Sequence, residues 1–198
     1  LRIWLLTGLG VNRYLAGDGQ GSLDNMRKAL AVRERFYPPD HPDRLLGESY
    51  VVQVELLLGD TAAARPVLTR VVREVERVCG KKSGAVGMVL QTLADLERRE
   101  GHFEQAKILA ERSLHLAPGP PETVITLALA EDGLGRPERT LRLLESDLKE
   151  RETSVGSGSP ELLTELEALR GVLSRSGRSA DAAEVAERTE RIRAAYQL

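Results

Sequence analysis

Apolar and polar residues alternate along the chain with the period of an α-helix, most clearly around Gly101. One apolar stripe precedes this glycine and another follows it, each with members three or four residues apart, as one face of a helix requires. The members are Val89, Leu90, Leu93, Leu96, Phe103, Ala106, Leu109, Ala110, Leu114 and Ala117. A glycine between two helices allows the first to end tightly and the second to fold back. The pattern therefore predicts a helical hairpin.

The same arrangement occurs five times. Each time, a glycine is followed five residues later by serine, alanine or threonine. The glycines are Gly17, Gly59, Gly101, Gly135 and Gly177, at spacings of 42, 42, 34 and 42 residues. Self-similarity with a period of this size is typical of helical repeat arrays. We therefore predict an all-α fold, an alpha-alpha superhelix of about five antiparallel helix pairs.

The residue five positions after each glycine falls on the first turns of the second helix of its pair. A small side chain there lets this helix approach its neighbour closely. We therefore expect this position to be buried in every unit. The residues are Ser22, Ala64, Ala106, Thr140 and Ala182, of which Thr140 is the largest.

Prolines mark the starts of several units. Pro42 and Pro160 each lie 25 residues after their glycine, and His41 and Ser159 precede them as candidate N-caps. In the shorter third unit, Pro118 is expected to end one helix and Pro121 to start the next. The units are expected at approximately residues 1–41, 42–83, 84–119, 120–159 and 160–198.

The pattern resembles a tetratricopeptide repeat array. The segment GHFEQAKILAERSLHLAP at 101–118 is similar to the 34-residue repeat in its glycine, the aromatic two residues later, the small Ala106 and Ser113, and the closing Pro118. The segment GQGSLDNMRKALAVRERFYPPDHPDRL at 19–45 resembles the longer repeats of the kinesin light chain type. The resemblance implies a single right-handed superhelical domain over residues 1–198, whose concave groove is lined by the first helix of each pair. It also implies a protein or peptide partner and no catalysis.

Positions 10, 6 and 3 residues before each glycine share one face of the first helix and are expected to line this groove. No unit carries asparagine at the middle position, and Arg98 is the only cation on the stripe. The asparagine ladder and the basic clamp that hold extended peptides in many family members are therefore absent. The candidate partner-binding residues are Tyr14, Tyr50, Gln53, Gln91, Asp95 and Arg98, weighed against an ordinary solvated face. Trp4, also near the N-terminal end of the groove, is expected in the core.

Composition narrows the classes of partner. In 198 residues, 28 basic side chains face 30 acidic ones, and the formal net charge is −2, so bulk electrostatics favours neither a nucleic acid nor a membrane partner. The apolar run at 1–11 is too short to span a membrane. A single cysteine excludes an internal disulfide. The 23 arginines against 5 lysines indicate a bacterial source, and the first residue, Leu1, suggests a piece of a longer chain; we expect a cytoplasmic setting.

No catalytic, cofactor or metal motif accompanies the three histidines. His41 lies in a linker, His102 in a turn and His115 on a helix, and we expect His102 to be exposed. We therefore predict no enzyme activity, no cofactor and no metal site. The expected function is a protein-interaction scaffold or regulatory module of a larger bacterial signalling or transcription regulator. The alternative is a self-association module, a homo-oligomer that stacks through its apolar terminal helices.

Overall fold

The computed structural model describes residues 2–15, 17–117 and 121–196. These residues form ten α-helices and one 3₁₀ turn, with no strand among them, which confirms the all-α fold. The elements are α1 (Arg2–Leu15), α2 (Gly19–Phe36), α3 (Pro42–Leu57), α4 (Ala64–Cys79), α5 (Gly84–Arg99), α6 (Phe103–Leu116), α7 (Pro121–Gly133), α8 (Pro137–Val155), η1 (Pro160–Leu162), α9 (Leu163–Arg175) and α10 (Ser179–Tyr196).

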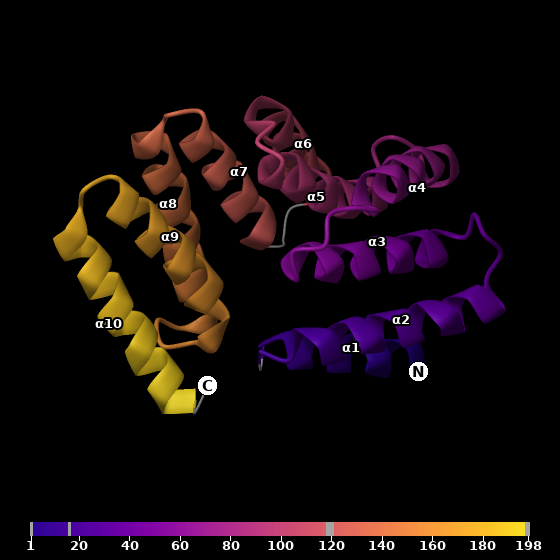
Figure 1. The fold of residues 1–198 in the computed structure, drawn as a ribbon, viewed down its shortest axis with the longest axis horizontal. Helices are drawn as coiled ribbons and strands as arrows, with labels where there is room; N and C mark the ends of the chain where they lie inside the picture. The colour runs from indigo at the N-terminus through magenta and orange to yellow at the C-terminus, as the bar shows by residue number, and fades with distance from the viewer. Residues whose placement is uncertain (1, 16, 118–120, 197–198) are drawn as a thin grey trace.

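Consecutive helices pack against each other, and the chain advances as a curved stack from α1 to α10 (Figure 1). The helices α3, α5, α7 and α9 also contact one another in succession, which places the first helices of these pairs along one side of the curve. α1 differs, since within the described residues α2 is the only helix whose backbone lies against it.

All five repeat glycines have a positive φ, between 75° and 87°. This left-handed conformation is strained for any residue with a Cβ atom, whereas glycine adopts it readily. The predicted role of these glycines at the turn of each hairpin is confirmed. Gly80 and Gly156, which the repeat pattern did not single out, have a similar φ and end α4 and α8.

The position five residues after each repeat glycine is buried in all five units, as expected. Thr140, the largest of the five residues, fits because its hydroxyl donates to the carbonyl oxygen of Ala128 on α7 at 3.0 Å. Close approach is also visible in the first unit, where a Cβ atom on Gly10 would lie 2.9 Å from Cε of Met26. Small residues therefore set the distance between paired helices.

The start signals act as predicted. Nδ1 of His41 accepts a hydrogen bond from the amide of Asp43 at 3.2 Å, and Ser159 caps the 3₁₀ turn through the amide of Glu161. α7 begins at Pro121. Pro118 and the unit boundary expected at 119–120 lie outside the described residues.

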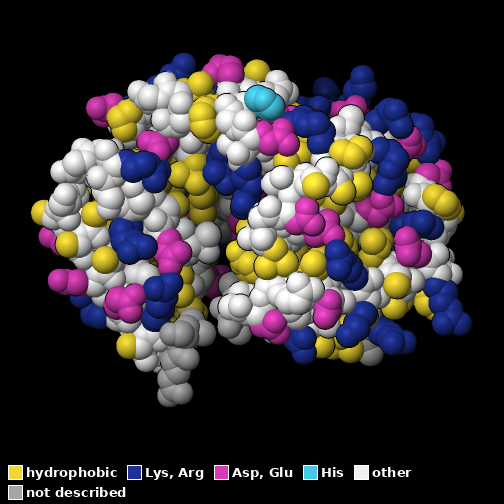
Figure 2. All heavy atoms as spheres, viewed as in Figure 1, with side chains coloured by type: hydrophobic (Ala, Val, Ile, Leu, Met, Phe, Trp, Pro, Cys, Tyr) yellow, Lys and Arg dark blue, Asp and Glu magenta, His cyan; other side chains and the backbone are white. Residues whose placement is uncertain are grey.

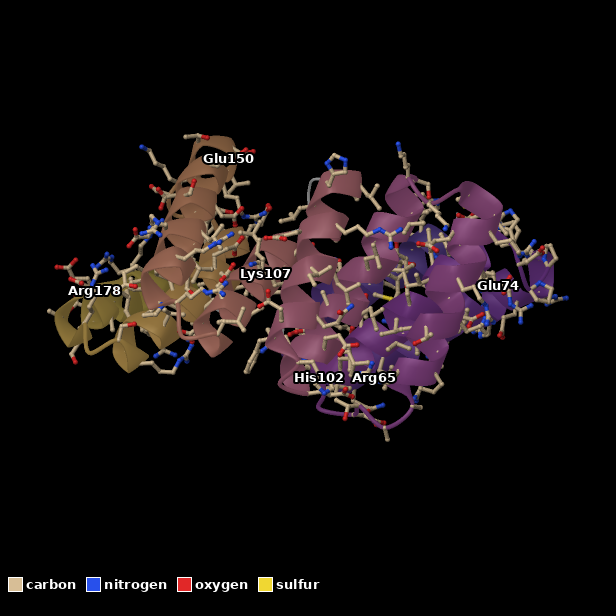
Figure 3. All side chains as sticks on the ribbon, turned by 90° about the horizontal axis from the view of Figure 1, so that it is seen from above. Arg65, Glu74, His102, Lys107, Glu150 and Arg178 are labelled. Carbon is tan, nitrogen blue, oxygen red and sulfur yellow. The ribbon has the colours of Figure 1, made fainter. Side chains whose placement is uncertain are left out.

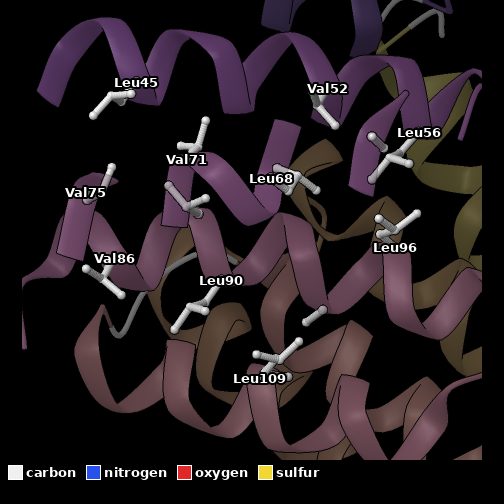
Figure 4. Packing of buried hydrophobic residues seen from close by; sticks show 14 of the residues in the cluster. Leu45, Val52, Leu56, Leu68, Val71, Val75, Val86, Leu90, Leu96 and Leu109 are labelled. Carbon is white, nitrogen blue, oxygen red and sulfur yellow. The ribbon is translucent and has the colours of Figure 1, made fainter. Parts of the chain in front are cut away.

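Buried apolar side chains form two large clusters and a small one. The first large cluster lies mainly between α3, α4, α5 and α6, where the close packing of its leucines and valines can be followed in Figure 4. The second joins α7, α8, α9 and α10. α7 contributes Leu127 to the first cluster, and Ile125 and Ala128 to the second. This helix therefore links the two halves of the core.

Trp4 is 82% exposed, so the core position expected for it is wrong. Leu5 and Leu9 are exposed on the same helix. The reason is the missing neighbour of α1: apart from α2, no described helix packs on it. Among the residues that the structure describes, no helix combines the length and the apolar character needed to cross a bilayer.

Candidate functional site

A pocket of about 310 Å³ lies among the first helices of all five pairs, with α2 forming part of its wall. Figure 2 shows the molecule hollowed between the part formed by α1–α6 and the part formed by α7–α10. The lining residues are Val11, Tyr14, Ser22, Met26, Gln53, Val54, Leu57, Gln91, Thr92, Asp95, Arg98, Arg99, Glu122, Ile125, Thr126, Leu129 and Thr164. The pocket volume lies at the lower end of the range for small-ligand sites, about 300–1,000 Å³.

Five of the six candidate residues come together in this pocket. Tyr14 reaches it from α1, Gln53 from α3, and the remaining three are listed next. These three, Gln91, Asp95 and Arg98, follow one face of α5. They meet because equivalent positions of successive first helices face the same side of the curve.

Tyr50 does not line the pocket. It is half-buried and packs against the small cluster formed by Leu23, Met26, Val51 and Val54. Burial raises the pKa of its phenol above the ordinary value. Its position one residue after Ser49 turns it away from the stripe that faces the hollow, because neighbouring residues on a helix point about 100° apart.

The polar centre of the pocket is an aspartate held between two arginines. Oδ1 of Asp95 accepts from Nε and Nη2 of Arg98, at 3.1 and 2.6 Å, and Oδ2 accepts from Nε of Arg99 at 2.7 Å. All three side chains are between 21% and 28% exposed. One carboxylate therefore faces two guanidinium groups, and Arg99 commits only its Nε to the network. Such half-buried groups attract charged ligands more strongly than fully solvated ones.

Tyr14 connects this centre to the C-terminal half. Burial raises the pKa of the Tyr14 phenol, Arg99 on α5 opposes this change, and Glu122 on α7 reinforces it. The phenol therefore lies within electrostatic reach of charged groups on two other helices. Its hydroxyl can donate or accept a hydrogen bond at the pocket wall.

Apolar side chains form the rest of the wall. Val54 and Leu57 come from α3, Met26 from α2, and Ile125 and Leu129 from α7. The pocket therefore combines an apolar surface with a few polar groups that can fix the orientation of a ligand, as ligand sites in proteins generally do.

Several lining residues were missed by the stripe at 10, 6 and 3 residues before each glycine. Thr92 and Thr126 lie 9 residues before their glycines, and Glu122 and Thr164 lie 13 residues before theirs. These positions continue the same helical face by one turn, so a stripe extended in steps of three and four would have found them. Met26 lies on a second helix and carries no such signal.

Outside the pocket, the described residues contain one group that could share a metal ion: Glu97, Glu100 and His102, whose ligand atoms lie within 4.8 Å of one another. Nδ1 of His102 is 2.8 Å from Oε2 of Glu97. Arg65 lies beside them (Figure 3); it donates to both oxygens of Glu97 and also contacts Glu100. The guanidinium already supplies the positive charge that these carboxylates require, so the group is a closed ion-pair network. His102 is exposed, as expected.

Comparison with known proteins agrees with the repeat pattern. The family model of the tetratricopeptide repeat matches residues 3–43. By sequence, the chain matches no curated protein.

Solved structures extend the likeness to nearly the whole chain. Repeats of a kinesin light chain from Podosopora anserina superpose with a TM-score of 0.62 at 19% identity, covering 99% of this chain and 96% of that one. A thermophilic TPR protein of Thermus thermophilus gives 0.63 at 19% identity, with 98% and 97% covered. BtubC from P. vanneervenii gives 0.63 at 18%, with 97% and 80% covered. The chain is therefore similar to tetratricopeptide-repeat proteins, by sequence in residues 3–43 and by fold over nearly its whole length.

Proposed function

We propose that this chain is a non-catalytic protein-interaction module, and that its pocket binds a segment of a partner protein. The observation that carries the proposal is the convergence of Tyr14, Gln53, Gln91, Asp95 and Arg98 on one hollow, together with an apolar wall. The fold supports it, because helical repeat arrays offer extended concave surfaces for binding.

The chemistry of the pocket favours a short segment with one apolar side chain and one carboxylate. Val54, Leu57 and Ile125 can surround an aliphatic or aromatic group. The N–H groups that Arg99 leaves outside the Asp95 network can donate to a carboxylate, since guanidinium and carboxylate groups pair in a planar, two-pronged geometry. Gln53 and Gln91 can donate to and accept from a peptide backbone. The volume accommodates a short anchor rather than a long extended peptide.

A peptide selection tests this proposal. Random peptides displayed on phage are selected on the wild-type chain, and the enriched peptides are measured by calorimetry. Binding should weaken at least tenfold in the triple variant Gln91→Ala, Asp95→Ala, Arg98→Ala. A matched triple variant, Gln105→Ala, Glu138→Ala, Arg142→Ala, removes the same side-chain types from exposed positions outside the pocket and should bind as the wild type does.

Circular dichroism must show that both triple variants remain helical. Equal binding of the selected peptides to all three proteins would place the interaction elsewhere and refute the pocket. Enriched sequences without both an apolar residue and an acidic residue or free carboxyl terminus would refute the proposed ligand chemistry alone.

We further propose that the module works in the bacterial cytoplasm as the regulatory part of a larger signalling or transcription protein. The excess of arginine over lysine, 23 to 5, supports the bacterial setting. The test is the complete gene: an open reading frame that encodes this chain and no further domain contradicts the proposal.

A further inference from the structure

The outer face of α1 is apolar and has no neighbour among the described residues. Trp4 is 82% exposed, Leu5 58% and Leu9 51%. The opposite face packs on α2, where Gly10 lies against Met26. Monomeric proteins rarely leave several large apolar side chains together on their surface, so an interaction partner is expected here.

The opposite end of the array presents a different surface. Ala182, Thr189 and Ile192 face inward from α10 and are buried. The outward face carries the small Ala183 and Ala194 together with glutamates at positions 184 and 187, all exposed. Small residues on a helix surface allow another helix to approach closely. The face of α10 is therefore shaped to receive a helix that brings the large side chains.

The interior of the molecule shows how such helices pack. The helices α3, α5, α7 and α9 each lie against the second helix of the preceding pair, namely α2, α4, α6 and α8. Within the described residues, α1 has no preceding second helix and α10 has no following first helix. A second copy of the chain can supply both, because the α10 of one copy and the α1 of the next have the same relation in the repeat order.

Charge gives this packing a direction. Three ion pairs join second helices of neighbouring units: Glu76 with Arg112 at 2.5 Å, Glu111 with Arg139 at 3.8 Å, and Glu152 with Arg188 at 2.5 Å. In each pair the earlier unit supplies the carboxylate and the later unit the arginine. The two ends of the molecule continue this rule, since α10 exposes glutamates and α2 exposes cations.

The register supports the same direction. Arg112 and Arg188 each lie 11 residues after the glycine of their unit, and Lys28 has this position in the first unit. Lys28 is exposed and lines a shallow hollow between α1 and α2 with Arg2 and Arg35. A carboxylate on the α10 of another copy would complete the pair that the later units make internally.

We propose that copies of this chain associate head to tail, with the α1 face of one copy packed on the α10 face of the next. The interface is heterologous, because it joins two different surfaces, so it leads to open rods or closed rings rather than to a symmetric dimer. The proposal goes beyond the pocket, which remains accessible on the concave side.

Analytical ultracentrifugation of the wild type and two blocked variants tests this interface. The wild type should show mass that grows with concentration. Leu5→Glu with Leu9→Glu blocks the α1 end, and Ala183→Arg with Glu187→Arg blocks the α10 end; each variant alone should be monomeric. A mixture of the two variants retains one complete interface and should form a one-to-one dimer that does not grow further. Ile108→Glu, at a residue 52% exposed on α6, is the control and should assemble as the wild type does.

Each other outcome overturns the proposal. A wild type that is monomeric at high concentration removes the association altogether. Dimers that only the α1 variant abolishes, with the α10 variant unaffected, indicate a symmetric contact between two α1 faces. A mixture of the variants that stays monomeric excludes the head-to-tail arrangement. Because the substituted side chains are exposed, circular dichroism should show unchanged helicity in all variants.

Discussion

Arg65 on α4 donates two parallel hydrogen bonds to the carboxylate of Glu97 on α5, from Nη1 to Oε1 at 2.6 Å and from Nη2 to Oε2 at 2.9 Å. The Glu97 side chain is 8% exposed, so removal of Arg65 leaves a buried carboxylate with little compensation. We expect Arg65→Ala to lower the free energy of unfolding at pH 7 by about 2 kcal/mol. Urea unfolding followed by circular dichroism measures this loss.

The same pair predicts a pH dependence. The hydrogen bonds from Arg65 hold the pKa of Glu97 below its ordinary value. A carboxyl group whose pKa is lower in the folded state stabilises the fold above its unfolded pKa, near 4.5, and this contribution is lost as the pH falls through the folded pKa. The difference between wild type and Arg65→Ala should therefore shrink in acid. Arg73→Ala removes an arginine that is 74% exposed and should change stability by less than about 0.5 kcal/mol; an equal loss in both variants would contradict the prediction.

Asp147 takes a position, 12 residues after the repeat glycine, where the other units have small or β-branched residues: Ala29, Val71, Ser113 and Thr189. Its Oδ2 is buried without a hydrogen-bond partner, and burial raises the pKa of the carboxyl group. We expect Asp147→Ala to raise the free energy of unfolding at neutral pH by about 1 kcal/mol.

The gain from Asp147→Ala should depend on pH. A carboxyl group with a raised folded pKa destabilises the fold when ionised, and protonation relieves this penalty as the pH falls through the folded pKa toward the unfolded value near 3.8. Unfolding of both proteins in urea at several pH values measures the effect. A gain that is the same at pH 7 and in acid would point to helix propensity instead of the charge.

Gly133 and Gly8 should respond oppositely to alanine. A Cβ atom on Gly133 would lie 2.5 to 2.6 Å from three ring atoms of Phe103, whereas a Cβ atom on Gly8 meets nothing within 4 Å. Overpacking at Gly133 should cost about 1–3 kcal/mol. Alanine in place of Gly8, inside α1, should stabilise by about 0.5–1 kcal/mol, because it restricts the unfolded chain. Thermal unfolding of the two variants checks the opposite signs; two losses of similar size would refute the packing argument.

Gly101→Ala isolates the cost of the left-handed turn. Its φ is 82° and no atom would contact an added Cβ, so steric crowding plays no part. We expect a loss of about 1–2 kcal/mol from backbone strain alone. Gly158→Ala, in an equally open place without a positive φ, is the matched control and should be close to neutral. Denaturant midpoints of the two variants decide the question.

The hairpins were predictable because their determinants are local. A turn with a positive φ demands glycine, and a close helix contact demands a small side chain, so Gly59 and Ala64 can be read from the sequence alone. The common face of the first helices was predictable for the same reason, since residues at fixed intervals from the turn point in one direction. This is why Gln53, Gln91 and Asp95 were placed together.

The remaining features depend on neighbours that the local pattern does not reveal. Trp4 was expected in the core on account of its residue type, but its burial requires a helix beside α1. Met26 lines the pocket from a second helix, and only the curvature of the stack brings it there. Arg99 lies one residue beyond Arg98, and its role became evident through its hydrogen bond to Asp95.

α7 contacts both large clusters, through Leu127 on one side and through Ile125 and Ala128 on the other. A small slide of this helix would therefore shift one half of the molecule against the other without repacking either interior, as in the shear motions of packed helices. The mouth of the pocket would widen or narrow with that slide, since Gln91 and Thr164 lie on opposite sides of α7. A ligand that touches both sides would fix the aperture, and the amide hydrogens of α7 would then exchange more slowly with solvent.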